Sequence, residues 1–277
     1  MILLDNNQLI IASLFHALKA EDGLSEDLVR HLVLNLYRTY RTKFSNKYGE
    51  IVICSDGGRY WRKDLFPYYK ANRKKQQKKS GVDWNSFYKI MNKIQNEVLN
   101  TFPYRNIHME GIEADDIIGI LCKHYADSEK IVIVSNDKDF QQLQRYPNVS
   151  QYSPFKRELL VCDNPEKFLI DHIIKGDSSD GIPNILSDDD VFVDEDKRQK
   201  PCGKKKIGQI KEELEKWTDS DNWNRNQQMI DMNMIPEEIE KRILEEYNKE
   251  PKGKRNKMLN YFIQNKLKIL MQHIEEF

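Results

Sequence analysis

Acidic residues stand at the ends of the most apolar short runs of this sequence. The runs 2–4, 51–54 and 131–134 lead within three residues into Asp5, Asp56 and Asp137. Because ligands of open parallel sheets bind where the strands end, we expect these three carboxylates to lie together at one edge. Oxygen ligands select hard divalent cations, so the pattern indicates a Mg²⁺ site, with Mn²⁺ as a substitute ion.

Further acidic motifs enlarge this candidate cluster. A Glu-Ala-Asp-Asp motif begins a predicted helix at residue 113, and a Gly-Asp-Ser-Ser-Asp motif begins at residue 176. So many like charges need bound cations or protons, and their number favours two ions, which suits in-line phosphoryl displacement. The simpler explanation is that each acid caps a helix or complements its dipole. The candidate metal ligands are Asp5, Asp56, Glu113, Asp115, Asp116, Asp137, Asp139, Asp177 and Asp180.

A cationic and aromatic stretch directly follows Asp56. Residues 59–79 contain nine bases, one acid and five aromatic residues. Because bases contact phosphates and aromatic rings stack on nucleobases, we expect nucleic acid to bind here, although most charge runs are only solvated surfaces. Lys70 and Arg73, one helical turn apart, can neutralise charge on the phosphate under attack. The candidate contacts in this stretch are Arg59, Arg62, Lys63, Tyr69, Lys70, Arg73, Lys74 and Lys75.

An α/β framework must position these residues. The three strand-like runs and a weaker one at 106–109 alternate with helical apolar patterns, which predicts a mostly parallel sheet flanked by helices. Beyond about residue 160 only helical patterns follow. We therefore predict an α/β catalytic domain over 1–160 and a smaller helical domain over 161–277. The predicted helices are 8–20, 25–44, 84–100, 114–125, 163–175, 204–217, 236–248 and 256–274.

The composition of the 277 residues is that of a folded, polar protein. Hydrophobic residues make up 39% and charged residues 32%, and mean hydropathy is −0.74. No apolar run approaches the roughly 20 residues that a bilayer crossing needs, and the first residues lack the basic start of a signal peptide. Four cysteines without a C-x-x-C pair argue against a zinc site or disulfide framework. We expect a cytoplasmic, monomeric protein that has no membrane as a partner.

Taken in order, five motifs resemble the signature of the 5′-nuclease/flap endonuclease family. They are ILL-Asp5, VICS-Asp56 with the following YWRKDLFPYYKANR, EADD from Glu113, SNDKD through Asp137, and GDSSDGIP from Gly176. The resemblance implies a PIN-like catalytic domain and a helix–three-turn–helix DNA-binding element in the helical domain. It also implies Mg²⁺-dependent hydrolysis of RNA·DNA and DNA duplexes from 5′ ends, as in RNA primer removal during replication, and cleavage of 5′ flaps.

The resemblance also implies a role for each matching residue. Asp5, Asp56, Asp115 and Asp137 would surround a first ion, and Asp139, Asp177 and Asp180 would serve a second. Glu113 and Asp116 would lie close by or bind through water, with Asp115 and Asp137 counted among the catalytic residues. Lys70 and Arg73 match a basic gateway helix, and Tyr69 would stack near the reacting nucleotide.

The sequence departs from the family pattern after Asp180. Gly181 and Asn184 replace the family's Asn and Gly, and the acidic segment 186–196 intervenes before Lys204, Lys205 and Lys206. We expect the grip on duplex phosphate to be rebuilt around these three lysines. The six acids of the segment could occupy the phosphate site in the free protein; the simpler alternative is a disordered, inert loop.

Two other functions stay open on the sequence alone. One is a PIN-type ribonuclease acting on single-stranded RNA, and the other is a metal-dependent nucleic-acid-binding protein that cleaves nothing. The histidines, among them His172, lie mostly in helical patterns and are expected only to pack or face solvent. The resemblance implies a host-cell location if the protein is phage-encoded, and a single-stranded-DNA-binding partner. An apolar stripe of Phe262, Ile263, Leu267, Leu270 and Ile274 either packs in the core or binds that partner.

Overall fold

A six-stranded sheet forms the centre of the molecule. The computed structural model describes residues 1–20 and 25–277, with all of their side chains except those of residues 20 and 74–76. The strand order is β3-β2-β1-β4-β5-β6. All neighbouring strands are parallel except β6, which runs antiparallel to β5. The bounds are β1 Ile2–Asp5, β2 Ile51–Ser55, β3 Arg105–His108, β4 Ile131–Val134, β5 Val149–Ser153 and β6 Glu158–Leu160.

Side chains alternate between the two faces of this sheet and build a separate core on each. Ile2 and Leu4 pack on one face with helices α1 (Asn6–Ala20), α2 (Glu26–Tyr48) and α5 (Trp84–Thr101). Leu3 packs on the other with α6 (Ala114–Tyr125), the 3₁₀ helix η1 (Lys138–Arg145) and α10 (Glu237–Tyr247). Because both faces are covered, the central strands are continuously apolar, as parallel strands usually are.

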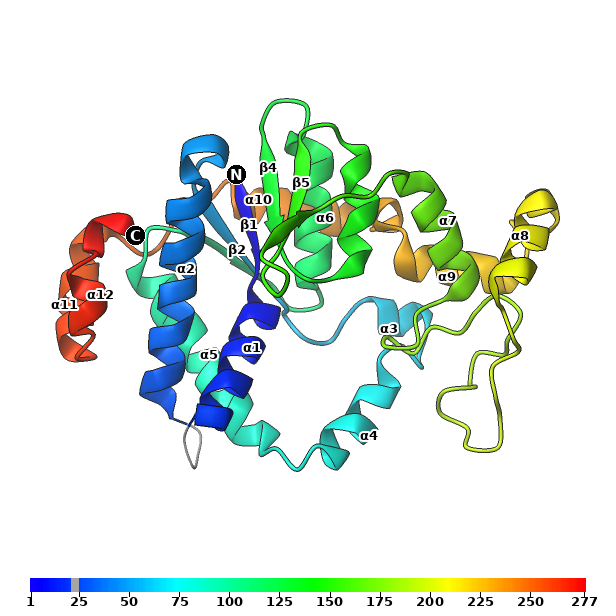
Figure 1. The fold of residues 1–277 in the computed structure, drawn as a ribbon, viewed down its shortest axis with the longest axis horizontal. Coiled ribbons are helices and arrows are strands. Elements are labelled where there is room, and N and C mark those ends of the chain that lie inside the picture. The colour runs from blue at the N-terminus through cyan, green and yellow to red at the C-terminus, as the bar shows by residue number, and fades with distance from the viewer. Residues whose placement is uncertain (21–24) are drawn as a thin grey trace.

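Two short helices carry the cationic stretch away from the end of β2. The chain passes through α3 (Arg62–Leu65) and α4 (Ala71–Lys79) before it returns in α5, and Figure 1 shows this segment as an arch between α3 and the base of α5. Its backbone is tied to the loop after α7 (Pro165–Lys175), because the Lys70 amide donates to the Asp180 carbonyl at 2.7 Å.

The second half of the chain contributes to three places. Helices α7, α8 (Lys204–Glu212) and α9 (Asp221–Ile230) form a third apolar core with Phe66 and Tyr69 of the arch. The segment from η3 (Met232–Met234) through α10 covers α6. Helices α11 (Arg255–Gln264) and α12 (Lys268–Met271) lie beside α2 and α5 at the far end (Figure 1). Short 3₁₀ helices η2 (Leu214–Lys216) and η4 (Ile274–Glu276) complete the chain.

The predicted α/β fold with a helical second half is confirmed, with differences in detail. Strand β5 and the edge strand β6 were not predicted, because their sequences VSQYS and ELL are short and only partly apolar. Helix α9 was also missed. The predicted helix 256–274 is broken into α11, α12 and η4. Phe262, Leu267 and Leu270 of the apolar stripe are core residues, whereas Ile263 is exposed.

No helix within the described residues is long and apolar enough to cross a bilayer.

Candidate active site

The nine predicted acids are brought to the carboxyl edge of the sheet and the loop beside it. Asp5 ends β1, Asp56 follows β2, and Asp137 precedes η1, whose first turn contains Asp139. Glu113 is the N-cap of α6, and Asp115 and Asp116 lie in its first turn. Asp177 and Asp180 come from the loop after α7. This is the edge at which parallel sheets bind ligands.

Neutral polar side chains hold the two acids of the central strands. The Ser135 hydroxyl donates to Asp5 at 2.7 Å. The Asn7 amide donates to Asp56 at 3.1 Å, and the Ala114 backbone N–H donates to the other oxygen of Asp56 at 2.8 Å. These contacts fix the carboxylates without neutralising them. Asn7 lies outside the five motifs, and Ser135 begins the SNDKD motif but had no role assigned to it.

Four of the nine acids are paired with lysine or arginine. Glu113 and Asp116 are buried. Together with the cations Arg62 and Lys70 they form the buried side of the site, which we call its inner wall. The pairs are Arg62 with Glu113 at 2.7 Å and Asp116 at 2.8 Å, Lys70 with Glu113 and with Asp180 at 3.5 Å, Arg73 with Asp180 at 2.5 Å, and Lys138 with Asp177 at 2.8 Å. Burial would raise the pKa of Glu113, but Lys70 and Arg62 outweigh it and lower that pKa.

The other five acids face no lysine or arginine at ion-pair distance among the described side chains. These five unpaired acids are Asp5, Asp56, Asp115, Asp137 and Asp139. Burial, followed by repulsion from neighbouring carboxylates, raises the pKa of each. The pKa values of Asp5 and Asp139 rise to about 7. Clustered oxygens with so little protein countercharge fit divalent cations.

The structure places Arg62 in the interior instead of on a nucleic-acid-binding surface. Its side chain is only 4% exposed. It pairs with Glu113 and Asp116, and its Nε donates to the Met229 carbonyl at 3.1 Å. An arginine with all sides engaged cannot reach a phosphate, so Arg62 stabilises the inner wall of the site.

Lys70 and Tyr69 are also withdrawn from solvent. Lys70 is 8% exposed, and its ammonium lies 4.9 Å from the centres of the Tyr60 and Tyr69 rings. The Tyr69 hydroxyl lies 3.1 Å from both Glu113 and Asp180, so its ring packs in the core and is not free to stack on a base. Lys70 also adopts a left-handed backbone conformation with φ of 56°, which is unusual for a residue with a Cβ.

The remaining predicted contacts of the arch lie further out. Arg73 is half-exposed and reaches Asp180 from the solvent side. Arg59 is exposed and pairs with Glu110 at 3.5 Å, and Lys63 is exposed beside the Tyr60 ring. The side chains of Lys74 and Lys75 lie outside the described residues, so their predicted contacts are not placed.

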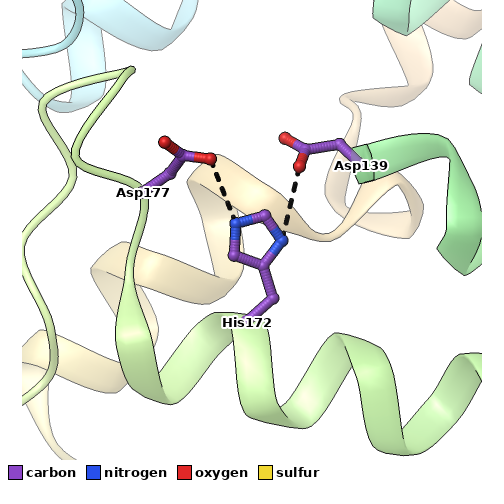
Figure 2. A group of neighbouring side chains, drawn as sticks. All are labelled: Asp139, His172 and Asp177. Carbon is purple, nitrogen blue, oxygen red and sulfur yellow. Dashed lines mark hydrogen bonds and ion pairs between the residues drawn. The ribbon is translucent and has the colours of Figure 1, made fainter. Parts of the chain in front are cut away.

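One residue of the site was expected only to pack or face solvent. His172, in the last turn of α7, is buried between Asp139 and Asp177 (Figure 2). Its Nε2 lies 3.2 Å from Asp177 and its Nδ1 lies 3.5 Å from Asp139. The available signal was its place five residues before Asp177, where Gly176 ends the helix and turns the chain back.

The acidic segment 186–196 is fixed at its base and lies beside the arch. Asn184 donates from its backbone to the Gln199 side chain and from its amide to the Lys200 carbonyl, both at 2.8 Å. Residues 191–195 line a groove with Ala71 and Asn72 at the start of α4. Three of the six acids in this segment pair locally, Asp188 and Asp190 with Lys197 at 3.7 and 2.7 Å and Asp189 with Arg225.

Lys204, Lys205 and Lys206 lie exposed in the first turn of α8. Replacing all three by Ala should weaken duplex binding by about tenfold near 0.1 M salt. It should also flatten the slope of log affinity against log salt by two to three units, since each phosphate contact contributes roughly 0.9. Fluorescence anisotropy at several salt concentrations measures both.

The matched control replaces Lys241, Lys266 and Lys268, which are exposed on α10, in the turn between α11 and α12, and on α12. An equal loss of slope in that control would mean that net charge, not the position of α8, governs binding.

Comparison with known protein families divides the chain in two. Residues 1–169 match the family described as 5′-3′ exonuclease, N-terminal resolvase-like domain, and residues 163–277 match T4 RNase H, C terminal. Ribonuclease H of Enterobacteria phage T4 is 30% identical over 289 aligned positions, covering 99% of this chain and 95% of that protein. Flap endonuclease Xni of Shewanella sp. (strain MR-4) is 31% identical over 145 positions, which cover 49% of this chain and 52% of that protein.

Solved structures share the fold. A complex of the bacteriophage T5 flap endonuclease with DNA and metal ions aligns with a TM-score of 0.63 at 17% identity, over 90% of this chain and 99% of that one. A crystal structure of the same T5 protein with metal ions aligns with a TM-score of 0.60 at 15% identity, over 89% of this chain and 97% of that one. Identities this low support the architecture alone.

Proposed function

The chain belongs to the 5′-3′ exonuclease family and is a nuclease, and from this premise we propose how and on what it acts. We propose that it hydrolyses phosphodiester bonds of DNA and RNA·DNA duplexes from 5′ ends and at 5′ flaps, as RNA primer removal requires. The observation that carries the proposal is that the nine acids fall into two groups. Four form ion pairs with lysine or arginine, and the five unpaired acids are free to bind divalent ions.

The five unpaired acids divide between two proposed ion positions. Asp5, Asp56, Asp115 and Asp137 would hold the first ion, while Asp139 would belong to the second together with the loop of Asp177 and Asp180. Divalent ions held in this way supply water activation and charge stabilisation for phosphodiester hydrolysis. We propose Mg²⁺ as the usual ion and Mn²⁺ as a substitute.

The cations beside the acids would position the substrate. Arg73 is held by Asp180 at 2.5 Å yet is exposed enough to exchange that partner for a phosphate. Lys70 lies deeper, between Glu113 and Asp180, and would stabilise negative charge that develops on the phosphate. Lys204–Lys206, and the arch near Lys74 and Lys75, would hold the duplex.

We also propose that the protein acts as a monomer in the cytoplasm of an infected host cell. A single-stranded-DNA-binding protein is a proposed partner, for which Leu259, Ile263 and Ile269 on α11 and α12 offer exposed apolar side chains.

The test is cleavage of three end-labelled substrates, namely an RNA·DNA hybrid, a nicked DNA duplex and a 5′-flap duplex. Each is incubated with Mg²⁺, with EDTA, and with the Asp137→Asn protein in Mg²⁺. We expect Mg²⁺-dependent release of short products from the 5′ end, absent in EDTA and in the variant.

A single-stranded RNA of the same sequence serves as the comparison substrate. Preferential cleavage of that RNA would favour the PIN-type ribonuclease. Intact substrates with normal duplex binding would indicate a protein that binds without cleaving.

A further inference from the structure

Two buried polar atoms face each other at the proposed second ion position. They are Nδ1 of His172 and Oδ1 of Asp139, 3.5 Å apart. Neither atom has a hydrogen-bond partner among the described residues. His172 is 95% withdrawn from solvent, since only 5% of its surface is exposed. A buried polar atom without a partner costs free energy on folding, so this arrangement indicates a ligand that binds between the two atoms.

The other side of the imidazole is fixed by a carboxylate that is already occupied. Nε2 of His172 lies 3.2 Å from Oδ2 of Asp177. The same oxygen accepts Lys138 at 2.8 Å, while Oδ1 of Asp177 accepts the Ser179 backbone N–H at 2.8 Å and the Ser179 hydroxyl at 2.5 Å. With both oxygens engaged by protein donors, Asp177 is arranged to hold the histidine by accepting Nε2–H.

This is the usual environment of a metal-binding histidine. Such a residue donates one ring N–H to a carboxylate, which fixes the tautomer and directs the lone pair of the other nitrogen at the ion. Ligand atoms about 2.1 Å from a shared ion, at right or tetrahedral angles, lie about 3.0 to 3.5 Å apart. The measured separation of His172 Nδ1 and Asp139 Oδ1 falls within that span.

We propose that His172 Nδ1 and Asp139 Oδ1 are ligands of the second ion, and that Asp177 positions the imidazole. This inference deepens the proposed function and rests on it. An imidazole ligand changes the selectivity of the site, because Mg²⁺ prefers oxygen ligands whereas Mn²⁺ and later transition metals accept nitrogen. The second position therefore binds Mn²⁺ or Co²⁺ more favourably, relative to Mg²⁺, than the all-oxygen first position does, although Mg²⁺ remains the usual ion.

Three substitutions separate a ligand from a positioning residue. His172→Gln can keep a donor toward Asp177 but has no atom at the place of Nδ1. His172→Asn can place its amide oxygen near Nδ1 but cannot reach Asp177 in the same way. His16→Gln makes the same change on an exposed histidine of α1 and is the matched control.

Metal binding to the whole protein is measured directly, without relying on cleavage. Isothermal titration with Mn²⁺ and with Mg²⁺ gives the affinities, and pulsed EPR of bound Mn²⁺ detects ¹⁴N coupled to the ion. We expect ¹⁴N coupling in the wild type and in His16→Gln, and none in His172→Gln. We also expect His172→Gln to lose about 10- to 100-fold in Mn²⁺ affinity at one site and less than about threefold in Mg²⁺ affinity. In His172→Asn the amide oxygen should coordinate Mn²⁺ in place of Nδ1, so part of the affinity returns but the ¹⁴N coupling does not.

Other outcomes overturn the assignment in distinct ways. Bound Mn²⁺ without ¹⁴N coupling in the wild type would make His172 a positioning residue only. A gain of Mn²⁺ affinity in His172→Gln would mean that the imidazole is a cation competing with the ion. Failure of any divalent ion to bind the wild type would instead refute the metal-dependent function itself. Circular dichroism of each variant shows that the fold is kept.

Discussion

Replacing Asp5 by Asn should stabilise the metal-free protein while it abolishes cleavage. Asp5 is buried between Asp56 and Asp137, and its pKa is raised to about 7, against about 3.9 in an unfolded chain. A carboxyl group whose pKa is raised on folding favours the folded state at low pH. That contribution is lost as pH rises from about 4 through 7, because the folded protein must then ionise a buried acid.

The expected gain from Asp5→Asn is on the order of 4 kcal/mol in the free energy of unfolding at pH 7.5, measured in EDTA. It should vanish below about pH 4, where the wild-type carboxyl is protonated in both states. In Mg²⁺, cleavage should fall by roughly 10³-fold or more, since ion-mediated charge stabilisation is worth several kcal/mol and each 1.36 kcal/mol is tenfold in rate.

Urea unfolding at pH 4 and pH 7.5, with and without EDTA, measures the stability half of this prediction. Asp127→Asn, which changes an exposed acid, is the control and should change stability by less than about 0.5 kcal/mol. A loss of stability in Asp5→Asn at pH 7.5 would mean that the ionised carboxylate is favourable where it lies, and that the acidic edge needs no cation.

Replacing Arg62 by Ala should destabilise the protein by about 3 to 5 kcal/mol, because the buried acids Glu113 and Asp116 would lose their shared cation. Arg62→Lys should not restore the loss, since one ammonium cannot replace a guanidinium that also donates to the Met229 carbonyl. Urea unfolding in EDTA gives both values.

The control for Arg62 is Arg41→Ala. Arg41 binds Glu50 through two nitrogens, at 2.7 and 3.0 Å, on the surface, and its loss should cost about 1 kcal/mol or less. Equal effects at the two positions would show that burial adds nothing to the Arg62 pairs. The inner wall would then be held by packing alone.

The cluster of acids at the carboxyl edge of the sheet could be predicted from the sequence, because one rule of parallel sheets places its three central residues. Asp5, Asp56 and Asp137 follow buried parallel strands, and parallel strands end on the same side. The sequence also indicated that a cationic stretch follows Asp56. What it could not indicate was which bases are buried, because Arg62 and Arg59 look alike in a charge run. Only the tertiary contacts of Arg62 with Glu113, Asp116 and the Met229 carbonyl distinguish them.

His172 illustrates the other limit of sequence reasoning. A histidine in a helical pattern is expected to pack in the core or face solvent, and the pattern gives no sign of a ligand role. Its meeting with Asp139 depends on α7 packing against η1, elements separated in the sequence by strands β5 and β6, which were themselves not predicted. Contacts that require two elements to pack across an unpredicted segment cannot be read from local spacing.

The left-handed backbone of Lys70 sets two energies against each other at one position. Glycine would adopt this conformation about 1 kcal/mol more easily than a residue with a Cβ, yet glycine has no ammonium to place between Glu113 and Asp180. Removing the cation of a buried ion pair costs about 3 to 5 kcal/mol, which exceeds the gain from the backbone. A screen for thermal stability would therefore retain the lysine just as a screen for cleavage would, and evolution tolerates the backbone angle at residue 70 as the smaller cost.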